Sequence, residues 1–185
     1  SDLFIDKNTI WDLAAQAGFN NYLLDAQHNG KGHNFYTEKE LENVENIRAS
    51  DIESDAEIFA LLEPIMEEDI APKFIYLGLK GAHFPFVNYG FKEYFQPAMK
   101  STNMLDATPE EVFNSYRNLV RANTNGFFEA LQHFLTKYPD TLVIYTSDHG
   151  QDLSTPKNKK THCDLRNPSI DEGTVPMLLI TSQAD

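Results

Sequence analysis

The sequence has little of several features that would define other classes of protein. Its single cysteine, Cys163, cannot form an internal disulfide, so cysteine usage does not fix a compartment. No stretch approaches the roughly 18 apolar residues of a membrane-spanning helix, and no signal peptide opens the chain. We therefore expect this chain to be soluble by itself, although a parent protein with a removed membrane segment would look the same. Basic residues are scarce, with 15 Lys and Arg against 28 Asp and Glu, and the resulting formal net charge of -13 argues against nucleic-acid binding.

Hydrophobic and acidic residues are what the chain has in quantity. Hydrophobic residues make up 41% and aromatic residues 12% of its 185 residues, which predicts one packed domain over residues 1–185. The acids concentrate between Glu38 and Asp69, where twelve of them face only Lys39 and Arg48. We interpret this run as solvated helix faces, and a role in recruiting cations or docking a partner is the alternative.

Signals for helices and strands alternate along the chain. Apolar runs predict strands at Asn21–Asp25, Lys73–Leu79, Thr141–Ser147 and Val175–Ser182. Capping residues and helical periodicity predict helices at Thr9–Ala17 (capped by Asn8 and ended by Gly18), Glu38–Ile47, Ile52–Glu68 and Pro109–Tyr138 (capped by Thr108). Apolar strands separated by helices indicate the α/β class, with a mostly parallel sheet flanked by helices on both faces. Functional groups in such sheets gather beyond the carboxyl ends of the strands.

One strand end carries an acid and a histidine. The predicted strand Thr141–Ser147 runs directly into Asp148 and His149, and Gly150 follows. Carboxylate oxygen and imidazole nitrogen suit zinc or manganese. Adjacent side chains on a straight strand point to opposite faces, so both can serve one ion only if the chain bends there, and Gly150 allows such a bend. By itself the Asp-His pair is weak support for a metal site.

Other histidines are candidates of lower rank. His83 follows the strand Lys73–Leu79 between a glycine and a proline, and His162 lies in a lysine-rich loop after the Asp-His pair. For each, a plain loop histidine is the alternative, and we interpret His133, inside the long helix, as structural. The remaining candidates are in loops, where a solvated surface is the alternative to substrate binding: His28, His33, Lys157, Lys159 and Lys160.

Taken together these segments resemble the sulfatase-like metalloenzymes of the alkaline phosphatase superfamily, and within it the bacterial lipid A phosphoethanolamine transferases and related phosphoglycerol transferases. The resemblance rests on Ser147–Gly150 after a strand, on His162 in the next loop, on Val175–Leu179 with its Val-Pro step, and on Gly81–Pro85 before an aromatic-rich stretch. The Asn8–Gln27 stretch resembles the helix-strand unit of the same enzymes, so the likeness covers nearly the whole chain.

The resemblance implies roles for four residues. Asp148 and His149 would be metal ligands, with zinc as the expected ion and manganese as the alternative. His83 and His162 would hold the transferred phosphoryl group or bind a second ion. The implied reaction moves a substituted phosphoryl group, by way of a covalent enzyme intermediate, from a phospholipid donor to a lipid or glycan acceptor. The implied location is the periplasmic side of a bacterial inner membrane, with the parent protein anchored in that membrane.

The sequence also departs from these families. We find no match for their nucleophile or remaining acidic metal ligand in Ser1–Lys7, so we expect the chain to be a C-terminal part of a catalytic domain, inactive alone and weak in metal binding. Gln151 stands where these families often have glutamate, and Cys163 contrasts with the several disulfides of many of them. A sulfatase or phosphodiesterase of the same fold, a non-catalytic interaction module and a degenerate inactive domain are the alternatives.

Overall fold

The computed structural model describes residues 9–27, 36–49, 51–68, 70–87, 93–153, 161–162 and 166–182. Several predicted features lie outside these ranges: Asn8, His28, His33, Lys157, Lys159, Lys160 and Cys163. The chain divides into two compact units, Ser1–Lys80 and Gly81–Asp185, and each has a hydrophobic cluster of its own. The single domain over residues 1–185 stays a prediction.

The first unit is built on a three-stranded parallel sheet. Its strands are β1 (Asn20–Asp25), β2 (Glu45–Arg48) and β3 (Lys73–Gly78), in the order β2-β1-β3. The central strand β1 places Leu23 opposite Asn46 of β2 and Tyr76 of β3. Leu23 and Leu24 on β1 are both buried, as a continuous apolar run in a parallel sheet requires. The predicted α/β class with parallel strands is confirmed.

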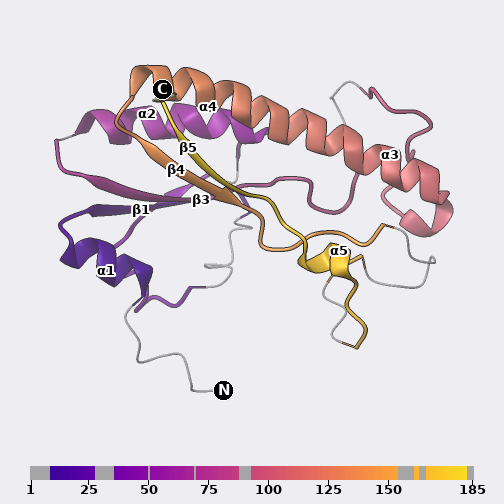
Figure 1. Cartoon of the computed structure of the whole chain (residues 1–185), viewed down its shortest axis with the longest axis horizontal. Coiled ribbons are helices and arrows are strands. Elements are labelled where there is room, and N and C mark those ends of the chain that lie inside the picture. The colour runs from indigo at the N-terminus through magenta and orange to yellow at the C-terminus, as the bar shows by residue number, and fades with distance from the viewer. Residues whose placement is uncertain are drawn as a thin grey trace. The chain divides into compact units, whose positions relative to one another are not determined.

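Helices cover both faces of this sheet (Figure 1). The helix α1 (Ile10–Gln16) contributes Trp11, which is buried against Leu23 and meets the Phe74 ring edge-on with ring centroids 5.4 Å apart. The helix α2 (Ile58–Glu68) lies on the opposite face, where the Tyr22 hydroxyl donates to Glu68 at 3.1 Å. Because side chains alternate along a strand, the neighbours Tyr22 and Leu23 reach the two different helices.

Three predictions for the first unit need correction. The predicted helix Glu38–Ile47 is wrong: residues 38–43 form turns and Glu45–Arg48 is the strand β2. Pairing with β1 and the burial of Leu41 in the Trp11 cluster outweigh the local helical preference. The cap of the first helix is Thr9 and not Asn8, because the Asp12 amide donates to the Thr9 hydroxyl and the Thr9 amide donates to Asp12 in return. The predicted helix Ile52–Glu68 begins later than expected, with the 3₁₀ turn η1 (Asp55–Glu57) before α2.

The second unit contains one long interrupted helix. It consists of α3 (Pro109–Val120), the π-helical segment η3 (Arg121–Asn125) and α4 (Gly126–Lys137). The predicted cap Thr108 is confirmed, since its hydroxyl accepts from the Glu111 amide and Pro109 occupies the first turn. The helix ends at its C-cap Tyr138, as predicted, whereas the π-helical segment was not expected. A 3₁₀ turn, η2 (Met104–Asp106), precedes α3.

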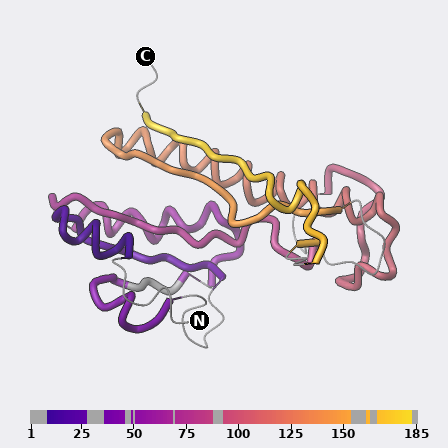
Figure 2. The backbone as a smooth tube through the Cα atoms, turned by 60° about the horizontal axis from the view of Figure 1, so that its bottom comes forward, coloured from indigo at the N-terminus to yellow at the C-terminus, as the bar shows by residue number. Residues whose placement is uncertain are grey.

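The strands of the second unit form an antiparallel pair. They are β4 (Leu142–Thr146) and β5 (Met177–Thr181), with Ile144 opposite Leu179. The short helix α5 (Ile170–Gly173) lies before β5. The pair runs alongside α4 in Figure 1 and in Figure 2. The Tyr145 ring of β4 lies 4.9 Å from the Phe128 ring of α4, which joins the strands to the helix.

Candidate metal centre

Asp148 and His149 leave the end of β4 on a backbone that hydrogen bonds hold in place. The Thr146 hydroxyl donates to the Pro176 carbonyl at 2.9 Å, which ties the strand end to the segment before β5. The Ser147 hydroxyl donates to the His149 carbonyl at 2.8 Å. These bonds turn the chain out of the strand, so the two side chains need not point to opposite faces.

Gly150 is required by a close approach of the chain to itself. Its amide donates to the Glu172 carbonyl at 2.8 Å, and a Cβ at this position would lie 1.9 Å from the Asp171 carbonyl oxygen. Among the described residues the glycines with positive φ are Gly18 and Gly81, so Gly150 has no left-handed backbone. The predicted bend is present at Asp148, and what the structure adds is that Gly150 is needed for the close approach and not for its φ. The lack of a side chain at Gly150 lets the segment before β5 pack directly against the Asp-His pair.

The carboxylate of Asp148 and the imidazole of His149 face each other. His149 Nε2 lies 3.8 Å from Asp148 Oδ2, and the two side chains are 27% and 84% exposed respectively. His149 Nδ1 lies 2.8 Å from the Gly150 carbonyl, which can only accept, so Nδ1 carries the proton and Nε2 presents its lone pair. Two tetrahedral ligand atoms on one zinc ion are about 3.3 Å apart. The pair therefore has the donor types, tautomer and approximate spacing of two ligands of one ion.

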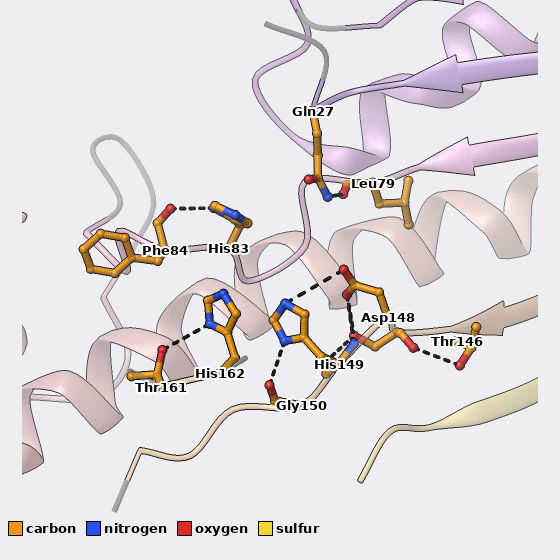
Figure 3. Close-up of polar contacts among 11 residues, drawn as sticks. Gln27, Leu79, His83, Phe84, Thr146, Asp148, His149, Gly150, Thr161 and His162 are labelled. Carbon is orange, nitrogen blue, oxygen red and sulfur yellow. Dashed lines mark hydrogen bonds and ion pairs between the residues drawn. The ribbon is translucent and has the colours of Figure 1, made fainter. Parts of the chain in front are cut away.

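His162 stacks on His149. The two rings are 4.2 Å apart between centroids and only 9° from parallel (Figure 3). The Asp152 amide donates to the Thr161 carbonyl at 2.7 Å, which brings this segment beside the Asp-His pair. Burial lowers the pKa of His162, the charges of His149 and His83 lower it further, and Asp148 and Glu172 partly oppose them. The stack thus favours a neutral imidazole at His162.

His83 belongs to the same group of side chains. It follows Gly81, whose φ of 57° starts a turn, and its Nδ1 lies 2.5 Å from the Phe84 carbonyl. That carbonyl fixes the tautomer as in His149 and leaves Nε2 as the lone-pair nitrogen. Its influence on the pKa of His162 and the close-up in Figure 3 both place His83 beside the stacked pair.

The structure therefore brings His83, Asp148, His149 and His162 together, all within the second unit. His133 lies exposed on α4. Within the described ranges no set of three or more His, Cys, Asp or Glu side chains is arranged to hold a metal ion. Asp148 and His149 fit an ion as two of its ligands, one carboxylate oxygen and one neutral imidazole nitrogen.

Sequence reasoning missed two polar residues beside this group. Glu172 on α5 is 8% exposed, and its charge raises the pKa of His162. Asn123, in the π-helical segment, is 5% exposed and donates to the Gly81 carbonyl at 2.8 Å. Neither residue has a sequence signal that sets it apart, because Asn123 is one of several asparagines in the long predicted helix and its partner is distant in sequence.

Comparison with known proteins assigns the family. Residues 2–184 match the sulfatase family, and the chain belongs to it. It is 23% identical over 194 residues to phosphoethanolamine transferase EptC of Escherichia coli K12, covering 98% of this chain and 33% of that protein. The chain thus spans about a third of the length of the curated relatives it matches.

Solved structures show the same fold. The C-terminal periplasmic domain of E. coli EptC superposes with a TM-score of 0.71 at 22% identity, over 98% of this chain and 54% of that one. The same domain in complex with zinc gives 0.71 at 20% identity, again over 98% and 54%. The lipooligosaccharide phosphoethanolamine transferase A of Neisseria meningitidis gives 0.72 at 16% identity, over 95% and 34%. Among the helices that the structure describes, none has the length and apolar character to cross a membrane.

Proposed function

We propose that this chain supplies the metal-binding part of an enzyme that transfers a substituted phosphoryl group, phosphoethanolamine or phosphoglycerol, from a phospholipid to a lipid or glycan acceptor. The observation that carries the proposal is the Asp148–His149 pair, with its 3.8 Å spacing and the tautomer that the Gly150 carbonyl selects. Membership of the sulfatase family and the similarity to a phosphoethanolamine transferase support the choice of reaction.

Asp148 and His149 would hold the ion, for which zinc is the expected choice and manganese the alternative. A bound divalent ion would neutralise charge on the phosphoryl oxygens and lower the pKa of an attacking hydroxyl. Asp148 supplies a negative charge and His149 a neutral nitrogen, so the pair leaves a net positive charge on a divalent ion for an anionic substrate. The Gly150 carbonyl orients the His149 ring, as an outer-shell partner does in known metal sites.

The two other histidines would act on the substrate in different ways. Thr161 Oγ1 lies 3.3 Å from His162 Nδ1, and a hydroxyl that donates there leaves the proton on Nε2 of the neutral ring. His162 can then donate from Nε2 to a phosphoryl oxygen without being charged. His83 in its neutral form presents a lone pair at Nε2 instead, so it suits accepting a proton from the acceptor's hydroxyl group or binding a second ion.

The attacking hydroxyl and the cellular setting come from the resemblance alone. We infer a covalent enzyme intermediate on a hydroxyl group of the enzyme, for which we find no match in Ser1–Lys7. We also infer that the reaction takes place at the periplasmic face of a bacterial inner membrane, with the whole protein anchored there.

An assay of the protein at its full encoded length tests the proposal. Phosphatidylethanolamine with a fluorescent acyl chain is incubated with zinc and lipid A, and the products are separated by thin-layer chromatography and mass spectrometry. Transfer yields fluorescent diacylglycerol together with lipid A that has gained phosphoethanolamine. A hydrolase of the same fold yields diacylglycerol and free phosphoethanolamine, with the acceptor unchanged. If neither phosphatidylethanolamine nor phosphatidylglycerol yields a product when metal is supplied, the proposal is contradicted.

Two variants link the activity to the site. We expect His149→Ala to abolish product formation, and His162→Ala to lower it roughly 100-fold, the usual effect of losing one donor to a developing charge. His133→Ala is the matched control, since that histidine is exposed on α4, and it should keep full activity. Equal losses in all three variants would mean that the histidines matter for folding and not for the reaction.

A further inference from the structure

Three buried asparagines of the long helix hold the irregular segment that connects β3 to α3. The side-chain amides of Asn114 and Asn118 donate to the carbonyls of Pro97 and Phe95, at 3.0 and 2.9 Å. Asn123 donates in the same way to the Gly81 carbonyl at 2.8 Å. All three side chains are at most 7% exposed. The helix thus anchors the connection at three points, and the third lies two residues before His83.

The π-helical segment explains how Asn123 stays on this face. Asn114 and Asn118 are four residues apart, which is the spacing of one face of an α-helix. Asn123 follows Asn118 by five residues, and it lies in η3 (Arg121–Asn125), the π-helical segment. Because π-helical bonds join residue i to residue i+5, such a turn is one residue longer and five-residue neighbours stack. Short π-helical insertions are rare and occur often at functional sites.

The anchored peptide group sets the direction of the His83 turn. Gly81 has φ of 57°, a left-handed conformation, and its carbonyl belongs to the peptide bond that leads into Ala82 and His83. The bond from Asn123 fixes the plane of that peptide. At the other end of the turn, His83 bonds its own neighbour Phe84, so this local bond cannot set the position of the turn relative to His162.

We propose that Asn123 is a positioning residue that holds the His83 turn beside the His149–His162 stack. The functional consequence rests on the proposed function, in which His83 acts on the substrate, whereas the positioning itself does not. The other side-chain atom, Asn123 Oδ1, is buried without a hydrogen-bond partner among the described residues. An asparagine with half of its hydrogen-bonding capacity unused is costly, and its retained bond to Gly81 is what this side chain contributes.

The test compares Asn123→Ala with the matched control Asn114→Ala. Each substitution removes one side-chain amide that donates to a carbonyl of the connection between β3 and α3, and the two side chains are similarly buried. The accepting carbonyl is 42 residues away in sequence for Asn123 and 17 residues away for Asn114. Long-range ¹H–¹⁵N correlation spectra of the metal-free chain report the His83 ring nitrogens in each variant. We expect the His83 signals to shift and broaden in Asn123→Ala and to keep their wild-type positions in Asn114→Ala. Both variants should lose similar amounts of melting temperature.

Kinetics of the full-length protein give the second readout. We expect kcat to fall 10- to 100-fold in Asn123→Ala with KM little changed, the usual effect of removing a group that orients a functional side chain, and to stay at the wild-type value in Asn114→Ala. If Asn123→Ala does not fold, Asn123→Leu keeps a similar branched shape without a donor or a charge and should give the same His83 shifts. Unchanged His83 signals in a folded variant, or equal changes in the Asn114 control, overturn the proposal. A wild-type protein without activity would contradict the proposed function, whereas the spectra would still decide the positioning.

Discussion

Replacing Gly150 by alanine places a methyl group where the chain leaves no room. The added Cβ would lie 1.9 Å from the Asp171 carbonyl oxygen, 2.8 Å from the Thr174 carbonyl oxygen and 3.1 Å from the Asp171 carbonyl carbon. All three atoms are backbone, so no side chain can rotate away to relieve the contact. The α5 segment or the Asp-His pair must move, and the bond from the Gly150 amide to the Glu172 carbonyl is lost or lengthened.

The size of the effect follows from these two terms. Overpacking of this kind costs about 1–3 kcal/mol, and the lost hydrogen bond costs about 0.5–1.5 kcal/mol. We therefore expect Gly150→Ala to lower the free energy of unfolding by about 1.5–4.5 kcal/mol. In a chain of this size that corresponds to a fall in melting temperature of roughly 3–18 °C. Far-ultraviolet circular dichroism during thermal and urea unfolding measures both quantities.

Gly173 provides the matched control in the same part of the chain. It is also a glycine without positive φ, and a Cβ there would meet nothing within 4 Å. Gly173→Ala should leave stability unchanged or raise it by about 0.4–1 kcal/mol, because alanine restricts the unfolded chain. A Gly150→Ala variant as stable as the wild type, or two variants with equal losses, would refute the reasoning that close approach selects Gly150.

Two further predictions concern the first unit. Leu24→Ala, at a fully buried position on β1, should lower the free energy of unfolding measured in urea by about 2–5 kcal/mol. The control Leu142→Ala, at a side chain that is 59% exposed on β4, should change it by no more than about 0.5 kcal/mol. Equal losses in the two variants would contradict the assigned core. Burial and the neighbouring Tyr76 raise the pKa of Tyr36 to about 12 from its ordinary value of 10.0. The stability gained by burying the neutral phenol is then complete below about pH 10 and lost as the pH rises through about 12, so Tyr36→Phe should flatten the pH dependence of the melting temperature in that window. Absorbance at the tyrosinate band should lose a tyrosine that titrates near pH 12 in the same variant, and an unchanged titration curve would contradict the assignment.

Most of the elements could be predicted because their signals are local. Apolar runs gave β1, β3, β4 and β5, and the Thr108-Pro109 step gave the start of α3. The strand β2 was misread as a helix because its conformation depends on pairing with β1, which is distant in sequence. The antiparallel direction of β5 against β4 and the π-helical segment also depend on the path of the chain, for which a local pattern has no signal.

The candidate site was predictable in composition and not in geometry. The rule that functional groups follow strand ends located Asp148, His149 and His83. His162 was a candidate of lower rank in the loop after the Asp-His pair, and the resemblance gave it a role. The stacking of His149 on His162 and the reason for Gly150 arise from contacts between separate segments. The tautomer of each ring depends on a contact with an adjacent residue, whose geometry the sequence does not give. Asn123 escaped notice because a buried asparagine looks like any other helix residue until its partner is known. The roles of the four site residues stay predictions.

Metal coordination at His149 Nε2 is the central claim, and nitrogen spectroscopy of the histidine rings tests it most directly. Long-range ¹H–¹⁵N spectra are recorded while zinc is added to the metal-free chain, and His133 serves as the exposed internal reference. We predict weak, saturable zinc binding that moves the ¹⁵N chemical shift of His149 Nε2 towards the value of a metal-bound nitrogen, while the proton stays on Nδ1. The substitution Asp148→Asn should weaken this zinc binding. Zinc that leaves His149 Nε2 unchanged, or that shifts His133 equally, would contradict a metal centre at the end of β4.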